Sequence, residues 1–138
     1  MTESEALELE IPSEPEYVGT ARLFLTAAGR HFELSEEVMA DLKMAVSEVC
    51  AGAIEDPRRP ERLRIALNPS DGALEVEVVP QAPGGTLGSP AGRPLTASSF
   101  EERLRGPLVQ ALFPNADYQP ELHSLRLSVA RELPAATG

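Results

Sequence analysis

Cysteine, histidine and basic side chains are scarce in this chain of 138 residues. A single cysteine, Cys50, excludes a disulfide within the chain and is typical of a reducing cytoplasm. Two histidines and one cysteine are too few for a structural zinc cluster, so we expect no metal centre. With 12 basic against 22 acidic residues, the net charge of −10 disfavours direct binding to nucleic acid or to anionic membranes.

Long apolar runs are also missing, and none approaches the roughly 20 residues that span a bilayer. The acidic N-terminus lacks the basic-then-apolar order of a signal peptide. What the chain does have is 42% hydrophobic residues, which is enough for a packed core. We therefore expect a cytoplasmic protein in which residues 1–138 form one domain and residues 1–5 are disordered.

The first half of the chain predicts one strand followed by two helices. Residues 6–11 alternate between apolar and acidic side chains, as in a half-buried strand. Ser13 and Glu16 are spaced as in a capping box, which predicts a helix from there to about Ala28, with Gly29 as its C-terminal stop. Residues 35–54 keep one face apolar at helical spacing and predict the second helix.

The second half predicts a hairpin, a long loop, a broken helix and a last strand. Residues 63–67 and 73–78 alternate, and the residues between them are typical of a turn. Residues 80–94 hold four prolines and four glycines without periodicity, which is typical of a functional or disordered loop.

Beyond this loop, Ser98 and Ser99 predict the start of a helix that Gly106-Pro107 should break or kink. A strand is expected at about 123–131, where apolar and polar side chains alternate again. Helices grouped on one face of a mainly antiparallel sheet, in a two-layer α/β sandwich of the α+β class, fit this order of elements.

The segment 34–54 resembles the second helix of the bacterial anti-sigma factor serine kinases, which have the histidine-kinase-like (Bergerat) ATPase fold. That helix carries Glu-x-x-x-Asn-Ala, and Glu48 to Ala53 match it except that Gly52 replaces the asparagine. The opening strand, the first helix, the hairpin and the final strand also follow in the family's order. The resemblance implies the Bergerat fold, and it gives Glu48 the position of the catalytic base.

The same resemblance implies that the nucleotide site is degenerate. Gly52 cannot supply the asparagine that ligates magnesium, and Pro80 and Ala82 replace the aspartate and first glycine of the adenine-binding Asp-x-Gly-x-Gly motif, which ends here at Gly84. The phosphate loop is reduced to Gly106, followed by a proline without an N–H. Losing two charge-assisted contacts of about 1.5–3 kcal/mol each would weaken ATP binding a hundredfold or more.

These comparisons favour a regulator that binds a sigma factor or an anti-anti-sigma factor without kinase activity and without a cofactor. Arg22 falls where the family carries an arginine that docks the sigma factor, and residues 80–97 take the place of the ATP lid. The resemblance also makes a homodimer plausible. Two alternatives stay open: an active serine kinase that uses ATP and magnesium to phosphorylate an anti-anti-sigma factor, and an interaction module of another bacterial signalling pathway.

Several candidate residues also have simpler interpretations. Without a magnesium partner, Glu48 is more readily a solvated or capping carboxylate than a base. Cys50 is expected to pack as a small buried residue. His31 is explained by a helix end, and His123 has no second ligand nearby in the sequence. Arg58 and Arg59 are expected in an exposed turn.

Overall fold

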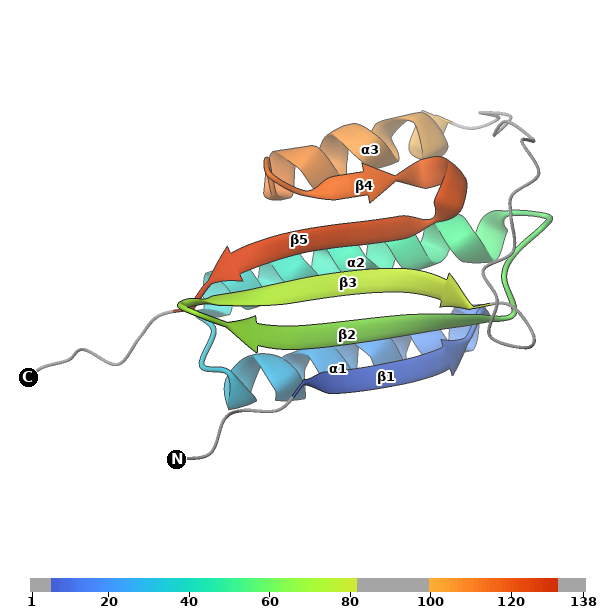
Figure 1. Cartoon of the computed structure of the whole chain (residues 1–138). Helices are drawn as coiled ribbons and strands as arrows, with labels where there is room; N and C mark the ends of the chain where they lie inside the picture. Colours follow the sequence, from blue (N-terminus) through green and yellow to red (C-terminus); the bar gives the residue numbers. More distant parts are fainter. Residues whose placement is uncertain (1–5, 82–99, 132–138) are drawn as a thin grey trace, which may run out of the picture.

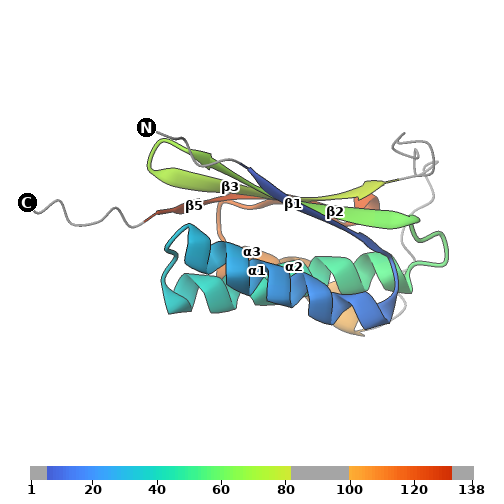
Figure 2. The ribbon, with the colours of Figure 1, turned by 90° about the horizontal axis from the view of Figure 1, so that it is seen from below.

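The structure is a computed structural model, and it describes residues 6–81 and 100–131. One antiparallel sheet forms one layer, and the helices cover one of its faces (Figures 1 and 2). The strands are β1 (Leu7–Pro12), β2 (Arg62–Ser70), β3 (Ala73–Gln81), β4 (Asp117–Gln119) and β5 (Ser124–Ala130). The helices are η1 (Pro15–Tyr17), α1 (Val18–His31), α2 (Glu36–Glu55), α3 (Phe100–Leu112) and η3 (Pro120–Leu122). The predicted two-layer sandwich is confirmed.

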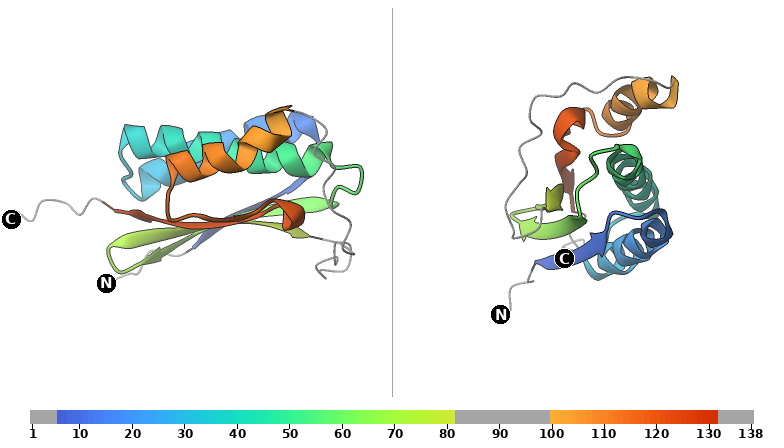
Figure 3. Two further views of the ribbon diagram at one scale, coloured as in Figure 1. Left: turned by 90° about the horizontal axis from the view of Figure 1, so that it is seen from above. Right: turned by 90° about the vertical axis from the view of Figure 1, so that its right-hand side faces the viewer.

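The strand order β1-β2-β3-β5-β4 places the hairpin β2–β3 in the middle of the sheet. Every pair of neighbouring strands is antiparallel, with β1 against β2 and β5 against β3. In the helical layer α2 lies between α1 and α3 (Figure 3). Consequently α2 contacts both other long helices as well as the sheet, and its side chains decide how the layers fit together.

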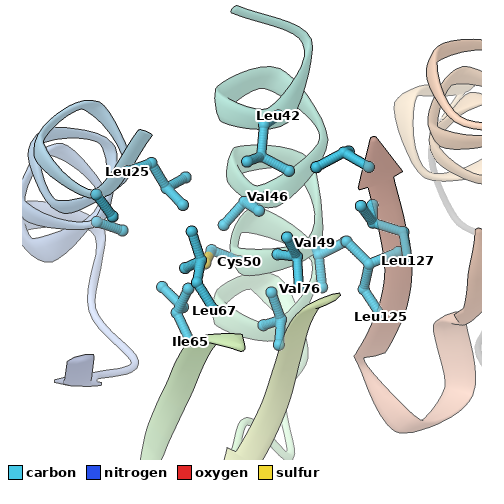
Figure 4. Close-up of a cluster of buried hydrophobic side chains, with 14 of the residues drawn as sticks. Leu25, Leu42, Val46, Val49, Cys50, Ile65, Leu67, Val76, Leu125 and Leu127 are labelled. Atoms are coloured by element: carbon cyan, nitrogen blue, oxygen red, sulfur yellow. The ribbon is translucent and has the colours of Figure 1, made fainter. Parts of the chain in front are cut away.

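The core lies between α2 and the sheet, as the apolar alternation of the strands predicts. Val46, Val49 and Cys50 of α2 point toward the strand side chains Ile65, Leu67 and Val76 (Figure 4). All six are fully buried. The predicted apolar stripe of α2 is confirmed from Leu42 to Ala53, with Val38 only partly buried. Burial of this kind stabilises a fold by about 25 cal/mol per Å² of apolar surface.

The start and end of the first helix differ from the prediction. Ser13 caps nothing: its hydroxyl is buried without a hydrogen-bond partner, and the chain enters α1 through the short helix η1. Gly29 does not stop the helix but lies within α1, where an added Cβ would sit 2.6 Å from the Met39 sulfur. Its lack of a side chain therefore serves close packing of α1 against α2, which the sequence pattern cannot distinguish from a C-cap.

The hairpin is tighter than predicted, because residues 68–70 continue β2 and only Asp71 and Gly72 form the loop. Gly72 has a φ of 66°, which favours glycine. Pro80 belongs to β3 and not to the loop that was expected to begin there. It is tolerated because the pairing of β3 with β5 ends at Val78, so Pro80 needs no donor on that side. The short strand β4 was not predicted.

The helix α3 runs unbroken through Gly106-Pro107, so the predicted break is wrong. The physical reason is tertiary packing. Arg105 and Val109, on either side of the two helix-disfavouring residues, are both buried. Ser98 and Ser99, proposed as the cap of this helix, lie outside the described residues.

Candidate degenerate nucleotide site

One face of α2 carries the residues that the sequence pointed to. Glu48 and Gly52 are four residues apart and Glu55 is three further on, so all three lie on one stripe of the helix. The side chain that meets this stripe comes from α3. It is Arg105, which sequence reasoning did not single out.

Arg105 is bound between two carboxylates of α2. Its Nε donates a hydrogen bond to Glu48 Oε1 at 3.1 Å, and its Nη2 donates to Glu55 Oε1 at 3.4 Å. The arginine side chain is only 7% exposed, whereas the side chains of Glu48 and Glu55 are 35% and 51% exposed. The guanidinium is thus enclosed between the helices, and its carboxylate partners retain access to water.

Gly52 is what makes room for this guanidinium. A Cβ built on Gly52 would lie 3.2 Å from Nη1, 3.4 Å from Cδ and 3.7 Å from Cζ of Arg105. The arginine therefore packs against the backbone of α2, where an added Cβ would make its guanidinium shift by a few tenths of an ångström. The position at which the resembled family has its asparagine is covered here by a side chain of α3.

The charges in this cluster support one another. Burial opposes the charged form of Arg105, but the hydrogen bond to Glu48 and the negative charges of Glu55 and Glu48 outweigh it, so the pKa of the guanidinium is raised. Arg105 consequently carries its full positive charge at any physiological pH. A permanent positive charge therefore lies beside both carboxylates of the stripe.

The described residues do not fit a magnesium-bound phosphate beside Gly52. Such a group needs free oxygen ligands for the metal. Gly52 offers no ligand, and one oxygen of Glu48 and one of Glu55 already bond Arg105, whose single positive charge balances one of their two negative charges. Within residues 6–81 and 100–131, no three His, Cys, Asp or Glu side chains gather where they could hold a metal ion.

The other predicted site residues are dispersed. Pro80 lies in β3, paired with Leu63 of β2. Gly106 lies inside α3 instead of in a loop before a helix, so its N–H is not presented to a phosphate as the predicted loop required. Ala82, Gly84 and most of the predicted lid at 80–97 fall outside the described residues. Arg22 is exposed on α1, as the docking hypothesis requires.

A second contact between ionisable side chains was also missed. His123 Nε2 lies 2.8 Å from Asp56 Oδ2, and the two side chains are 9% and 19% exposed. Burial raises the pKa of Asp56, but the backbone N–H of Arg58 and the His123 ring outweigh it, so the pKa is lowered overall. The contact ties the end of α2 to the start of β5.

Position in the fold explains why both contacts were missed. His123 lies 67 residues after Asp56 in the sequence, and Arg105 lies 57 residues after Glu48. For Arg105, the one signal in the sequence is its place next to Gly106-Pro107 within a helical pattern. A helix that continues through Gly-Pro needs tertiary packing to stabilise it. His123 has a left-handed backbone with a φ of 53°.

Two simpler expectations are settled by burial. Cys50 is fully buried, as predicted, and burial raises the pKa of its thiol to about 12. Arg58 and Arg59 are exposed at the turn that follows α2, as predicted, and Arg59 Nη1 donates to the backbone oxygen of Ser13 at 2.8 Å. None of these residues adds chemistry to the stripe on α2.

The chain matches the histidine kinase-like ATPase domain family over residues 11–129. It belongs to this family. The predicted resemblance to the serine kinases is confirmed by curated relatives. The serine-protein kinases RsbW of Bacillus velezensis and Oceanobacillus iheyensis are each 41% identical over 54 residues, and RsbW of Bacillus subtilis is 39% identical over 49 residues.

These matches cover 36–39% of this chain and 31–34% of the relatives, so the chain aligns with about a third of their length. A crystal structure of the RsbU and RsbW domains of a Mycobacterium tuberculosis protein aligns with a TM-score of 0.59 at 16% identity. That alignment covers 94% of this chain and 32% of the other, and it shows that the fold is shared. No helix in the described parts of the chain is long and apolar enough to cross a membrane.

Proposed function

We propose that this histidine kinase-like ATPase domain is an anti-sigma-factor-like regulator that acts by binding a protein partner and transfers no phosphate. Its relatives are serine-protein kinases RsbW, which supports a place in the same kind of regulation. The observation that carries the loss of catalysis is the ion cluster of Arg105 with Glu48 and Glu55 over Gly52.

This cluster removes two things that phosphotransfer needs. Glu48, the residue at the base position, already accepts a hydrogen bond from Arg105 Nε at its Oε1, so this oxygen is not free to receive a substrate hydroxyl. Arg105 lies against the backbone at Gly52, and this position offers no ligand to a metal ion that would neutralise charge on a transferring phosphate. Binding another protein requires neither feature.

The exposed face of α1 is a suitable docking surface. Residues Val18–His31 contain no Asp or Glu, although the whole chain has 22. Arg22 is exposed there, beside Leu23, which is 72% exposed. Basic and apolar groups together on an otherwise acidic protein favour a partner with an acidic, apolar surface. A sigma factor or an anti-anti-sigma factor is the proposed partner.

The first experiment is calorimetric titration of the folded protein with ATP and magnesium, accompanied by a phosphotransfer assay on an anti-anti-sigma protein. We expect no submillimolar binding and no phosphorylated product. Submillimolar binding together with transfer that Glu48→Ala abolishes would overturn the proposal. It would establish the second candidate, an active serine kinase, which the names of the relatives favour.

The docking surface is tested by reversing charge at Arg22. We expect Arg22→Glu to weaken capture of a purified sigma factor at least tenfold, because it places an acid opposite an acidic partner. Arg103→Glu is the matched control, since Arg103 is exposed on α3 at the other side of α2. Equal capture by both variants would show that α1 is not part of the interface. Capture of a different signalling protein would support the remaining alternative, an interaction module of another bacterial signalling pathway.

A further inference from the structure

The contact between α2 and α3 centres on one arginine, Arg105. We call its contact with Glu48, Gly52 and Glu55 the latch. Arg105 from α3 lies against the backbone at Gly52 and bonds the carboxylates of Glu48 and Glu55. We propose that this guanidinium holds α3 closed on α2 without any ligand, so that the degenerate site is permanently shut from within. The inference concerns the conformation of α3, and it goes beyond the question of whether phosphate is transferred.

The sequence of α3 shows that this helix depends on such a contact. Gly106 and Pro107 stand in the middle of the helix, where each of them destabilises helical backbone, and proline removes a hydrogen-bond donor. A helix with this centre needs tertiary contacts to persist. Arg105 and Val109, which flank the pair, are its buried residues among those whose side chains are described. The latch therefore acts where α3 is weakest by itself.

Arg105 and Gly52 also fit closely against each other. A methyl group at Gly52 would come within 3.2 Å of the guanidinium, whereas a Cβ added at Gly106 would meet nothing within 4 Å. Arg105 also contacts the carboxylates of Glu48 and Glu55. Both carboxylates are partly exposed, so water can satisfy their remaining hydrogen bonds. An arginine and a glycine on different helices thus depend on each other.

The test is amide hydrogen exchange of the full chain, followed over the described part of α3 and, as a reference, over β2 and β3. We expect Arg105→Gln to speed exchange in α3 about tenfold or more while exchange in β2–β3 is unchanged. Arg64→Gln, which removes an arginine with two carboxylate partners on the sheet, is the matched control and should leave α3 unchanged. Unchanged exchange in the Arg105→Gln variant overturns the latch.

A second variant keeps the test decisive if Arg105→Gln folds poorly. Gly52→Ala should speed α3 exchange in the wild-type background, since the methyl group displaces the guanidinium, but should have no further effect in an Arg105→Ala background. Equal effects of Gly52→Ala in both backgrounds would contradict the mutual dependence of the two residues.

Exchange with and without magnesium ATP separates this inference from the proposed function. We expect wild-type α3 to exchange at the same rate in both conditions. Phosphotransfer to an anti-anti-sigma protein without a change in α3 exchange would refute the proposed function and leave the hold of Arg105 on α3 intact. A change in α3 exchange on adding magnesium ATP would refute the latch.

Discussion

Two arginines in this protein each bind two glutamates, but in opposite surroundings. Arg105 is enclosed between two helices, whereas Arg64 lies on the open face of the sheet and bonds Glu8 at 3.3 Å and Glu77 at 3.5 Å. Their side chains are 7% and 29% exposed. The difference teaches that the same pair of residue types can hold one helix on another or simply cover a solvated surface.

The open face of the sheet shows how the second case arises. Charges alternate from strand to strand, with acids on β1 and β3 and arginines on β2 and β5, so that each arginine finds carboxylates on neighbouring strands. The pairs are partly hydrated and salt screens them. The buried cluster has no such alternative, because an unpaired guanidinium between α2 and α3 would be desolvated without compensation.

The largest expected effect is the difference between Arg105→Ala and Arg64→Ala. We expect the first to lower the free energy of unfolding by about 2–4 kcal/mol, through lost ionic contacts and lost packing of the arginine stem. The second should lower it by about 0–1 kcal/mol. Urea denaturation of both variants measures this, and losses of equal size would erase the comparison between the clusters.

The next effect sharpens the comparison at the glycine beneath the buried cluster. Gly52→Ala and Gly106→Ala both add a methyl group to a helix, which by itself favours the helix. Only at Gly52 does the methyl meet a neighbour, the Arg105 guanidinium. We expect the free energy of unfolding of the Gly52→Ala protein to be about 1–2 kcal/mol lower than that of the Gly106→Ala protein. Thermal unfolding of the two variants would decide it, and a more stable Gly52→Ala protein would speak against the crowding.

The contact of His123 with Asp56 extends the comparison to pH. Because the folded pKa of Asp56 lies below its unfolded value of about 3.9, the carboxylate stabilises the fold above that pH. This stabilisation is lost as the pH falls through the folded pKa. We expect Asp56→Asn to cost about 1 kcal/mol at neutral pH and progressively less below about pH 4. A cost that is independent of pH would mean that charge plays no part in the contact.

The smallest effect is the response of the two clusters to salt. The destabilisation by Arg64→Ala, already about 1 kcal/mol or less, should vanish in about 1 M sodium chloride, where the Debye length is about 3 Å. The destabilisation by Arg105→Ala should largely persist there, because the guanidinium is enclosed between the helices and the packing of its stem does not depend on salt. The measurement is urea denaturation of both variants at low and high salt, and parallel salt responses would show that both pairs are equally solvated.

Local pattern determined much of this protein without any structure. The alternation in residues 63–67 and 73–78 predicted the central hairpin, and the apolar stripe of residues 35–54 predicted α2, whose N-cap Ser35 accepts a hydrogen bond from the N–H of Val38. Order and spacing were enough to recognise the family. These features are local because they depend on period and on residues a few positions apart.

Tertiary structure alone decided the rest. Gly29 is a packing residue and not a helix stop, because Met39 of the next helix lies against it. α3 passes through Gly106-Pro107, because Arg105 and Val109 are buried on either side. Most of all, the partner of Glu48 stands 57 residues away along the chain. No periodicity carries such a contact, since it exists only once two helices are laid side by side on a sheet.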